Sequence, residues 1–219
     1  MADYATEDEQ LEALKRWWEE NARSVIFGII LAVVGVSGWQ GWQWYTDTQS
    51  ENAASVYRQI QNQMPMGDPT QVLGAAETLR SDFGRTNYAA LGAMAAARVL
   101  ARQGDYTGAA DWLEWVVDNA REDSLQAIAR VRLARVLGEQ GDTDAALDLL
   151  RSDAPPGWAA MHREVSGDLL AMRGDHEQAA EEYEQALATD GTVSDRELVR
   201  LKLNRVRAGR DIAGVDLDS

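Results

Sequence analysis

The sequence contains no cysteine and only two histidines. Without cysteine, the chain has no disulfide bond, no cysteine-ligated zinc, no iron–sulfur cluster and no thiol nucleophile. Its glycines are scattered and form no phosphate-binding loop. His162 and His176 lack both an H-E-x-x-H pattern and a carboxylate at metal-ligand spacing, so we expect both to be structural, with His176 in a solvated turn. The sequence therefore predicts no catalytic residue, no metal site and no cofactor.

Basic residues are also scarce. The chain has 21 Lys and Arg against 36 Asp and Glu, which gives a formal net charge of −15. A chain this acidic repels a phosphate backbone, so nucleic acid is excluded as a partner. The length of 219 residues is enough for one large domain or two small ones with a substantial core.

What the sequence does contain is a long uncharged segment near its N-terminus. No charged residue lies between Arg23 and Asp47, and Val25–Tyr45 is apolar at first and then rich in tryptophan. A helix over this stretch is about 31 Å long, which matches the hydrocarbon core of a bilayer. We predict one transmembrane helix over residues 24–46. The predicted membrane-interface anchors are Trp17, Trp18, Trp39, Trp42, Trp44 and Tyr45.

Two other interpretations of this segment are a cleaved signal peptide and a buried helix of a soluble domain. A signal peptide is disfavoured because many residues precede the apolar run and aromatic rings end it. A buried helix is disfavoured because the uncharged run exceeds about 18 residues. Lys15, Arg16 and Arg23 precede the span and only Arg58 follows it closely, which predicts a cytoplasmic N-terminus. In a bacterium this is a single-pass inner-membrane protein with a periplasmic C-terminal domain.

Residues 1–23 form the predicted cytoplasmic segment. Thr6 and Glu9 have the spacing of a capping box, and the apolar residues that follow recur at helical intervals. We expect an amphipathic helix at the membrane interface. Its role is either to anchor the chain or to dock another membrane protein, and the sequence favours the first.

A repeated motif dominates the rest of the chain. It reads G-D-Y-T-G-A-A from Gly104, G-D-T-D-A-A-L from Gly141 and G-D-H-E-Q-A-A from Gly174, at intervals of 37 and 33 residues. Around each glycine the positions in common are a small residue (Ala97, Ala134, Gly167), a leucine (Leu100, Leu137, Leu170), an alanine (Ala109, Ala146, Ala179) and a large apolar residue (Leu113, Leu150, Tyr183).

This pattern predicts two antiparallel helices joined by a tight turn. Glycine ends the first helix in a left-handed conformation, and the following aspartate caps the second. One such pair cannot bury its apolar face, so the pairs stack into a solenoid. The repeats over Ala90–Thr189 resemble the tetratricopeptide repeat (TPR), whose period is about 34 residues, although proline appears only as Pro155-Pro156. The predicted fold class is all-α, a single transmembrane helix followed by a TPR-like α-solenoid.

Less regular helices flank the repeats. Glu51–Gln63 and Pro69–Phe83 predict an atypical capping pair. A capping box at Ser194 and Glu197 predicts a closing helix. On that helix, one predicted face carries Leu198, Leu201, Leu203 and Val206, and the other carries Arg200, Lys202, Arg205 and Arg207. We therefore expect a TPR-like domain over residues 47–210 and a flexible tail over residues 211–219.

If the repeats form a solenoid, its concave face is the predicted protein-binding groove. The candidate residues, counted along the first helix of each repeat, are Leu91, Met94, Arg98, Arg102, Ile128, Val131, Arg135, Met161, Glu164, Asp168 and Met172. Flexible methionines suit several partners or unfolded segments. An equally good interpretation is that Arg98 and Arg135 only pair with neighbouring acids.

The N-terminus adds a family resemblance. The stretch T-E-D-E-Q-L-E-A-L-K-R-W-W-E-E-N from Thr6, the anchor helix directly after it, and Gly38-Trp39 with Trp42 resemble the start of the YfgM family. The resemblance implies a non-enzymatic ancillary subunit of the SecYEG translocon that works with a PpiD-type periplasmic chaperone. It also implies contact with nascent exported polypeptide and the lipid bilayer. Alternatives are a TPR scaffold for cell-wall synthesis or division, and a membrane-anchored enzyme.

Overall fold

The computed structural model describes residues 7–64, 68–151, 154–155, 157–191 and 193–213. Within these residues it is helical, with no strand, so the predicted all-α class is confirmed. The chain divides into two compact units, Met1–Gln49 and Ser50–Ser219. The helices are α1 (Glu7–Gln63), α2 (Pro69–Asp82), α3 (Asn87–Arg102), α4 (Tyr106–Asn119), α5 (Asp123–Gln140), α6 (Thr143–Arg151), α7 (Ala159–Arg173), α8 (His176–Ala188) and α9 (Arg196–Ala213).

Helix α1 contains the predicted amphipathic segment, the predicted span and the first helix of the predicted capping pair without a break. Within it, Leu14–Gln63 includes a window apolar enough to cross a membrane, with a mean hydropathy of 1.8, and none of that window is buried. Among the described residues, nothing packs over the uncharged stretch as it would over the core helix of a soluble domain. The capping box predicted at Thr6 lies outside the described residues.

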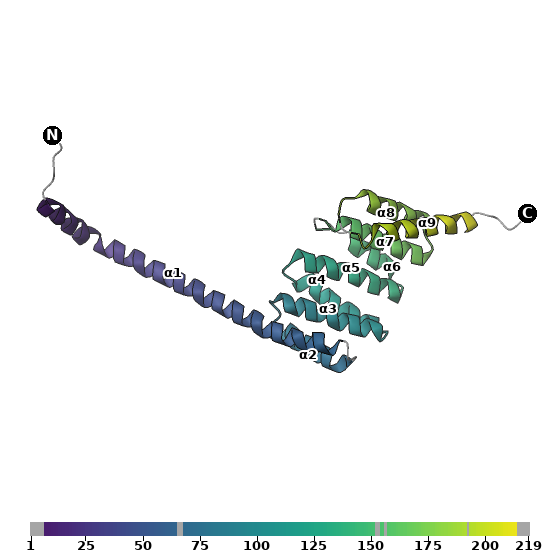
Figure 1. Cartoon of the computed structure of the whole chain (residues 1–219), viewed down its shortest axis with the longest axis horizontal. Coiled ribbons are helices and arrows are strands. Elements are labelled where there is room, and N and C mark those ends of the chain that lie inside the picture. The colour runs from purple at the N-terminus through teal and green to yellow at the C-terminus, as the bar shows by residue number, and fades with distance from the viewer. Residues whose placement is uncertain (1–6, 65–67, 152–153, 156, 192, 214–219) are drawn as a thin grey trace, which may run out of the picture. The chain divides into compact units, whose positions relative to one another are not determined.

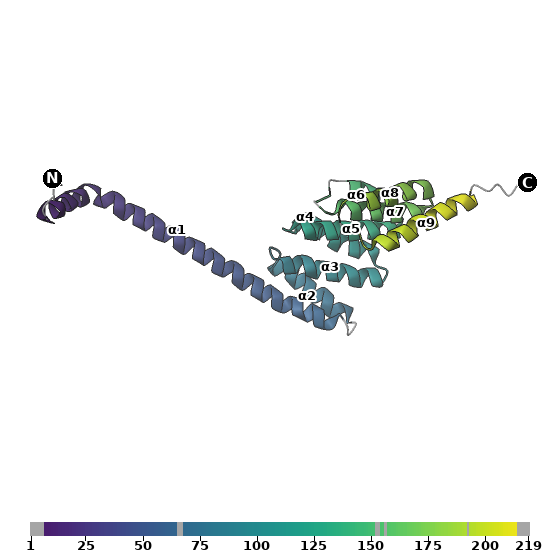
Figure 2. The same ribbon diagram turned by 45° about the horizontal axis from the view of Figure 1, so that its top comes forward.

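The second unit is a stack of antiparallel helices. Each helix from α2 to α9 packs against the next, and α5 also packs against α3 and α7. Helices α3, α5 and α7 lie side by side in both views of the ribbon (Figures 1 and 2). The last part of α1 packs on this unit, since Ala53 and Ile60 are buried with Val72 and Leu79 of α2.

The glycines of the repeat turns adopt the conformation that the sequence predicts, whereas the predicted aspartate cap does not form in every repeat. Gly104, Gly141 and Gly174 have φ angles of 81°, 90° and 93°, in the left-handed region that favours glycine. In each turn the N–H of the next aspartate donates to the carbonyl of the leucine that the motif repeats, at 2.9 to 3.0 Å. The aspartates differ in their side chains. Asp105 accepts from the N–H of Gly108, whereas Asp175 caps nothing and instead pairs with Arg173 at 2.5 Å.

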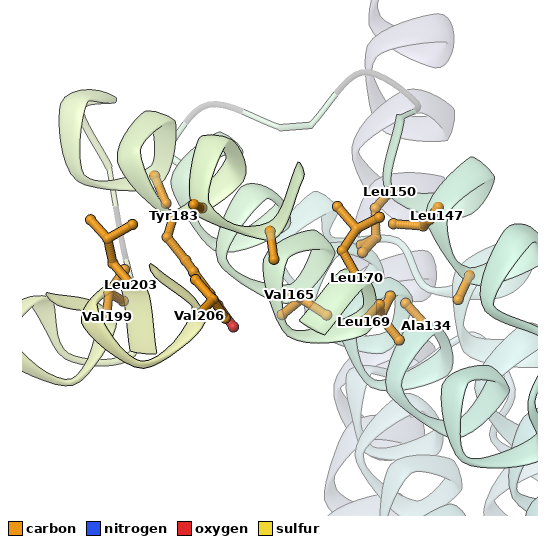
Figure 3. Close-up of a cluster of buried hydrophobic side chains, with 14 of the residues drawn as sticks. Ala134, Leu147, Leu150, Val165, Leu169, Leu170, Tyr183, Val199, Leu203 and Val206 are labelled. Carbon is orange, nitrogen blue, oxygen red and sulfur yellow. The ribbon is translucent and has the colours of Figure 1, made fainter. Parts of the chain in front are cut away.

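One pair of residues distinguishes the third repeat. Where the first two repeats have alanine opposite leucine, the third has Gly167 opposite Tyr183. A Cβ on Gly167 would lie 2.7 Å from Cε1 of Tyr183, so only glycine leaves room for the ring. Tyr183 therefore fills the core between α7 and α8, and Figure 3 shows its side chain directed toward Val206 of α9.

The closing helix α9 differs from the prediction in two ways. Its N-terminal cap is Asp195, whose Oδ1 accepts from the N–H groups of Glu197 and Leu198 at 2.8 and 3.3 Å, and not Ser194. Its buried face is Val199, Leu203 and Val206, labelled in Figure 3, while Leu198 and Leu201 are exposed. Helix α9 continues to Ala213, three residues into the predicted tail, and residues 214–219 lie outside the described part.

Candidate protein-binding groove

Two adjoining hollows lie along the first helices of the repeats, and they share Arg135. We call them together the groove. The first encloses about 340 Å³ and is lined by Met94, Ala97, Arg98, Ala101, Leu113, Arg132, Arg135 and Val136. The second encloses about 390 Å³ and is lined by Arg135, Glu139, Asp168, Leu169, Ala171, Met172, Tyr183, Lys202, Arg205 and Val206. The groove therefore runs from α3 and α5 to α7 and α9.

Some of the residues predicted from the repeat offsets line this groove. They are Met94, Arg98, Arg135, Asp168 and Met172. Met172 is exposed, with 61% of its surface open to solvent. Arg102 instead lines a separate hollow with Met64 and Val72, on the side of α2.

The remaining predicted residues line neither hollow, and each is buried or partly buried against the core of the solenoid. They are Leu91, Ile128, Val131, Met161 and Glu164. The physical reason is that α3, α5 and α7 pack against one another, so the earlier positions of each helix are used between repeats. Only the positions nearer the C-terminal end of each helix remain for a ligand.

Glu164 makes the clearest correction. Its side chain is 0% exposed, its Oε2 accepts from the N–H of Ser194 at 2.8 Å, and its Oε1 accepts from the Ser194 hydroxyl and from Lys202 Nζ. Burial alone would raise the pKa of Glu164, but the hydrogen bonds from Ser194 and Lys202 outweigh burial and lower it. The carboxylate of Glu164 on α7 therefore links this helix to Ser194, just before α9, and to Lys202 on α9.

Asp168 belongs to the same cluster. Its Oδ1 lies 2.8 Å from Lys202 Nζ and accepts from the Tyr183 hydroxyl at 2.8 Å. Burial of the Tyr183 ring, with the charge of Asp168 next to it, raises the pKa of that phenol, which stays a donor. The acidic end predicted for the groove is therefore neutralised from within the chain.

The other end of the groove is positively charged. Arg98, Arg132 and Arg135 line the first hollow together, and in the described part of the chain no ion pair joins any of them to a carboxylate. The pKa of Arg132 is lowered, first by partial burial and then by the positive charges of Arg98 and Arg135. The interpretation that Arg98 and Arg135 only pair with neighbouring acids therefore does not hold among these residues.

The repeat offsets miss two basic residues of the groove, Arg132 and Arg205. Arg132 precedes Arg135 by three positions on α5, a spacing that puts both side chains on one helix face. That signal is readable in the sequence. Arg205 reaches the second hollow only because α9 folds back onto α7 and α8, which no local pattern predicts.

Both histidines lie within the helical stack. His162 is buried, and its Nδ1 lies 3.1 Å from the carbonyl of Leu150. Burial lowers the pKa of His162 more than that hydrogen bond raises it. His176 is half-buried next to Gly209 of α9, so it is not the solvated turn residue that the sequence suggests. Among the residues that the structure describes, no three His, Cys, Asp or Glu side chains gather as metal ligands.

The aromatic residues of the first unit are exposed. Between 47% and 73% of the surface of each ring-bearing residue of α1 up to Tyr45 is open, with Trp44 the most exposed. Exposed large rings in or next to an uncharged helical stretch are typical of surface that another apolar phase covers.

Comparison with known proteins agrees with the repeat geometry. A family model described as a tetratricopeptide repeat-like domain matches residues 15–208. The chain belongs to this tetratricopeptide repeat-like family. The match begins before the predicted span, so the family includes the helix that carries it as well as the repeats.

The chain is also similar to several curated proteins that share one name. The chain is 28% identical to the ancillary SecYEG translocon subunit of Aggregatibacter actinomycetemcomitans over 206 residues, which is 94% of this chain and 100% of that protein. It is 28% identical to the ancillary SecYEG translocon subunit of Escherichia coli over 94% of this chain and 99% of that protein. The protein of the same name from Neisseria gonorrhoeae is also 28% identical over 94% of this chain. The YfgM resemblance read from the N-terminus is thereby confirmed.

Proposed function

We propose that this protein is a membrane-anchored TPR adaptor, an ancillary subunit of the Sec translocon that holds a polypeptide-binding groove at the channel exit. The observation that carries the proposal is the similarity to ancillary SecYEG translocon subunits over 94% of the chain, from the apolar helix through the repeats. In this function the chain acts by binding alone, without catalysis or a cofactor.

The anchor is the uncharged part of α1. Its apolar window is unburied, and its aromatic residues are exposed where a headgroup region would surround them. The excess of Lys15, Arg16 and Arg23 over Arg58 favours an N-terminus in the cytoplasm and a repeat domain in the periplasm, as a single-pass protein of the bacterial inner membrane.

Tethering is the mechanism. A groove on a membrane anchor meets its ligand at a raised effective concentration, so that weak contacts suffice to hold an emerging chain. The partners we propose are SecYEG subunits at the anchor, and a PpiD-type chaperone and nascent exported polypeptide at the groove. The open methionine Met172 and the apolar floor of both hollows suit segments of varied sequence.

Photo-crosslinking in membranes tests the assignment. A photoreactive residue at Trp42 reports on the anchor, one at Met172 reports on the groove, and one at Asp118, an exposed residue that does not line the groove, is the control. We expect SecYEG subunits at Trp42 and chaperone or exported chains at Met172, with neither at Asp118. Capture of cell-wall or division proteins at both positions would replace the Sec assignment with a scaffold for another envelope assembly.

Orientation has a separate test, which the absence of cysteine makes simple. A single cysteine introduced as Glu12→Cys or Asp118→Cys is the only thiol in the protein. In intact cells whose outer membrane has been permeabilised, a maleimide that cannot cross the inner membrane should label Asp118→Cys and spare Glu12→Cys. The reverse pattern would refute the proposed orientation.

A further inference from the structure

We propose that the groove selects acidic polypeptide segments, with Arg98, Arg132 and Arg135 as the residues that bind their carboxylates. This inference rests on the proposed function, since it assumes that the groove binds polypeptide, and it adds the chemical class of the ligand. Three guanidinium groups around one hollow of about 340 Å³ are the feature that carries it.

Arg98 and Arg135 repel Arg132, and the Tyr57 side chain offsets only part of that repulsion. Arg98 and Arg135 each lower the pKa of Arg132, which means that both disfavour its charged form. The chain has an excess of acidic residues, yet no described carboxylate pairs with any of the three. Elsewhere its arginines do find partners, as Arg173 does with Asp144 and Asp175. A ligand carboxylate would supply the missing partner, because a guanidinium binds a carboxylate through two parallel hydrogen bonds.

The apolar residues of the groove indicate which other side chains the ligand carries. Below the arginines lie Met94, Leu113 and Val136, and the second hollow continues with Leu169 and Val206. A ligand that satisfies both parts carries carboxylates and apolar side chains in close alternation, as an extended polypeptide does. Both hollows together are lined by Arg98, Arg132, Arg135, Lys202 and Arg205 against Glu139 and Asp168, and Asp168 is already bonded to Lys202 and Tyr183. The remaining charge therefore favours an acidic segment.

A polyanion such as nucleic acid does not fit the same site. Its phosphates would meet the chain's formal charge of −15 outside the groove. A short acidic segment is exposed to that repulsion over a much smaller surface, and salt at physiological strength screens it beyond about 8 Å. The geometry thus points to a local contact with a polypeptide and not to a broad electrostatic surface.

Calorimetric titration of the full-length protein in detergent micelles tests the inference. The probes are a synthetic peptide whose aspartates are separated by leucine and serine, and the same peptide with asparagine at each aspartate. We expect the acidic peptide to bind about tenfold more tightly than its amide counterpart, with an affinity that falls as salt is added. Each of three single substitutions should lower the affinity for the acidic peptide about tenfold and leave the affinity for the amide peptide unchanged. They are Arg98→Gln, Arg132→Gln and Arg135→Gln.

Arg121→Gln is the matched control. Arg121 is exposed, has no ion partner among the described residues and lines neither hollow, so its loss changes the net charge equally without touching the groove. The melting temperature separates binding from folding. Because Arg132 is repelled by its neighbours, Arg132→Gln should melt no lower than the parent protein while it loses acidic binding.

Two results would overturn the inference, and they differ in what else they affect. Equal affinity for the two peptides would refute acidic selection but leave the peptide-binding groove intact. Absence of binding by either peptide would refute the groove as well, whereas capture of SecYEG at Trp42 would still support the anchor.

Discussion

Replacement of Lys202 by methionine should release the closing helix α9. The Lys202 ammonium lies 2.9 Å from Oε1 of Glu164 and 2.8 Å from Oδ1 of Asp168. Without it, Asp168 keeps the Tyr183 hydroxyl, but Glu164 stays fully buried as an anion with only Ser194 to bind it. Removal of one partner of a buried ion pair costs about 3–5 kcal/mol, and we expect the low end, about 3 kcal/mol, because Ser194 remains.

The assay is chemical denaturation of the full-length protein in micelles, combined with hydrogen exchange of the α9 amides. Arg200→Met is the matched control, since Arg200 lies on the exposed face of the same helix and, among the described residues, pairs only with exposed Glu197. That surface pair should contribute less than about 0.5 kcal/mol. The α9 amides should exchange faster in Lys202→Met and at the parent rate in Arg200→Met.

A second variant separates a lost ion pair from general damage. Glu164→Leu together with Lys202→Met removes both charges and fills the site with apolar side chains, so stability should return to within about 1 kcal/mol of the parent protein. The reasoning would be refuted if Lys202→Met destabilised the protein no more than Arg200→Met. It would also be refuted if the double variant were less stable than Lys202→Met.

Three more predictions follow from the third repeat and its neighbours. Gly167→Ala should cost about 1–3 kcal/mol in denaturation because its Cβ meets the Tyr183 ring, and Tyr183→Leu in the same chain should restore most of the loss by recreating the pair of the other repeats. His162 has a lowered pKa, so its folded form is neutral. Stability should be complete above about pH 6.5 and fall by at most about 1.4 kcal/mol per unit as the pH drops below that value, a slope that His162→Gln should remove. Glu164 also has a lowered pKa, but as an acid: its contribution is present above the unfolded pKa of about 4.5 and is lost as the pH falls through the lower folded pKa. Glu164→Gln should flatten that acid limb of a pH titration of stability, and an unchanged limb would contradict the assignment.

Much of the fold could be predicted from the sequence because it depends on residues that are close together in the chain. A glycine followed by aspartate, with leucine before and alanine after, is enough to end one helix and begin the next, and the structure forms all three turns in this way. The uncharged run of α1 is equally local, since its length and composition alone make it long enough to cross a bilayer.

The groove was predicted only in part. The repeat offsets assume that every first helix presents the same face to solvent, and this holds for Arg98, Arg135 and Met172. It fails for Val131 and Glu164, because packing of one repeat on the next uses those positions. The three-residue spacing of Arg132 and Arg135 was visible in the sequence, but the proximity of Arg98 depends on how α3 and α5 pack.

The sequence by itself determined the long uncharged helix, the helix pairs and their turns, because each follows from hydrophobic length or from the backbone preferences of single residues. Only the tertiary structure decided which face of α9 is buried, that Ser194 binds Glu164 and does not cap a helix, and which charges cancel. Those outcomes depend on residues thirty or more positions apart, such as Glu164 with Ser194 and with Lys202. A carboxylate is tolerated in the core only when hydrogen-bond donors and a positive charge surround it. These partners come from distant parts of the chain, so a local sequence pattern cannot identify them.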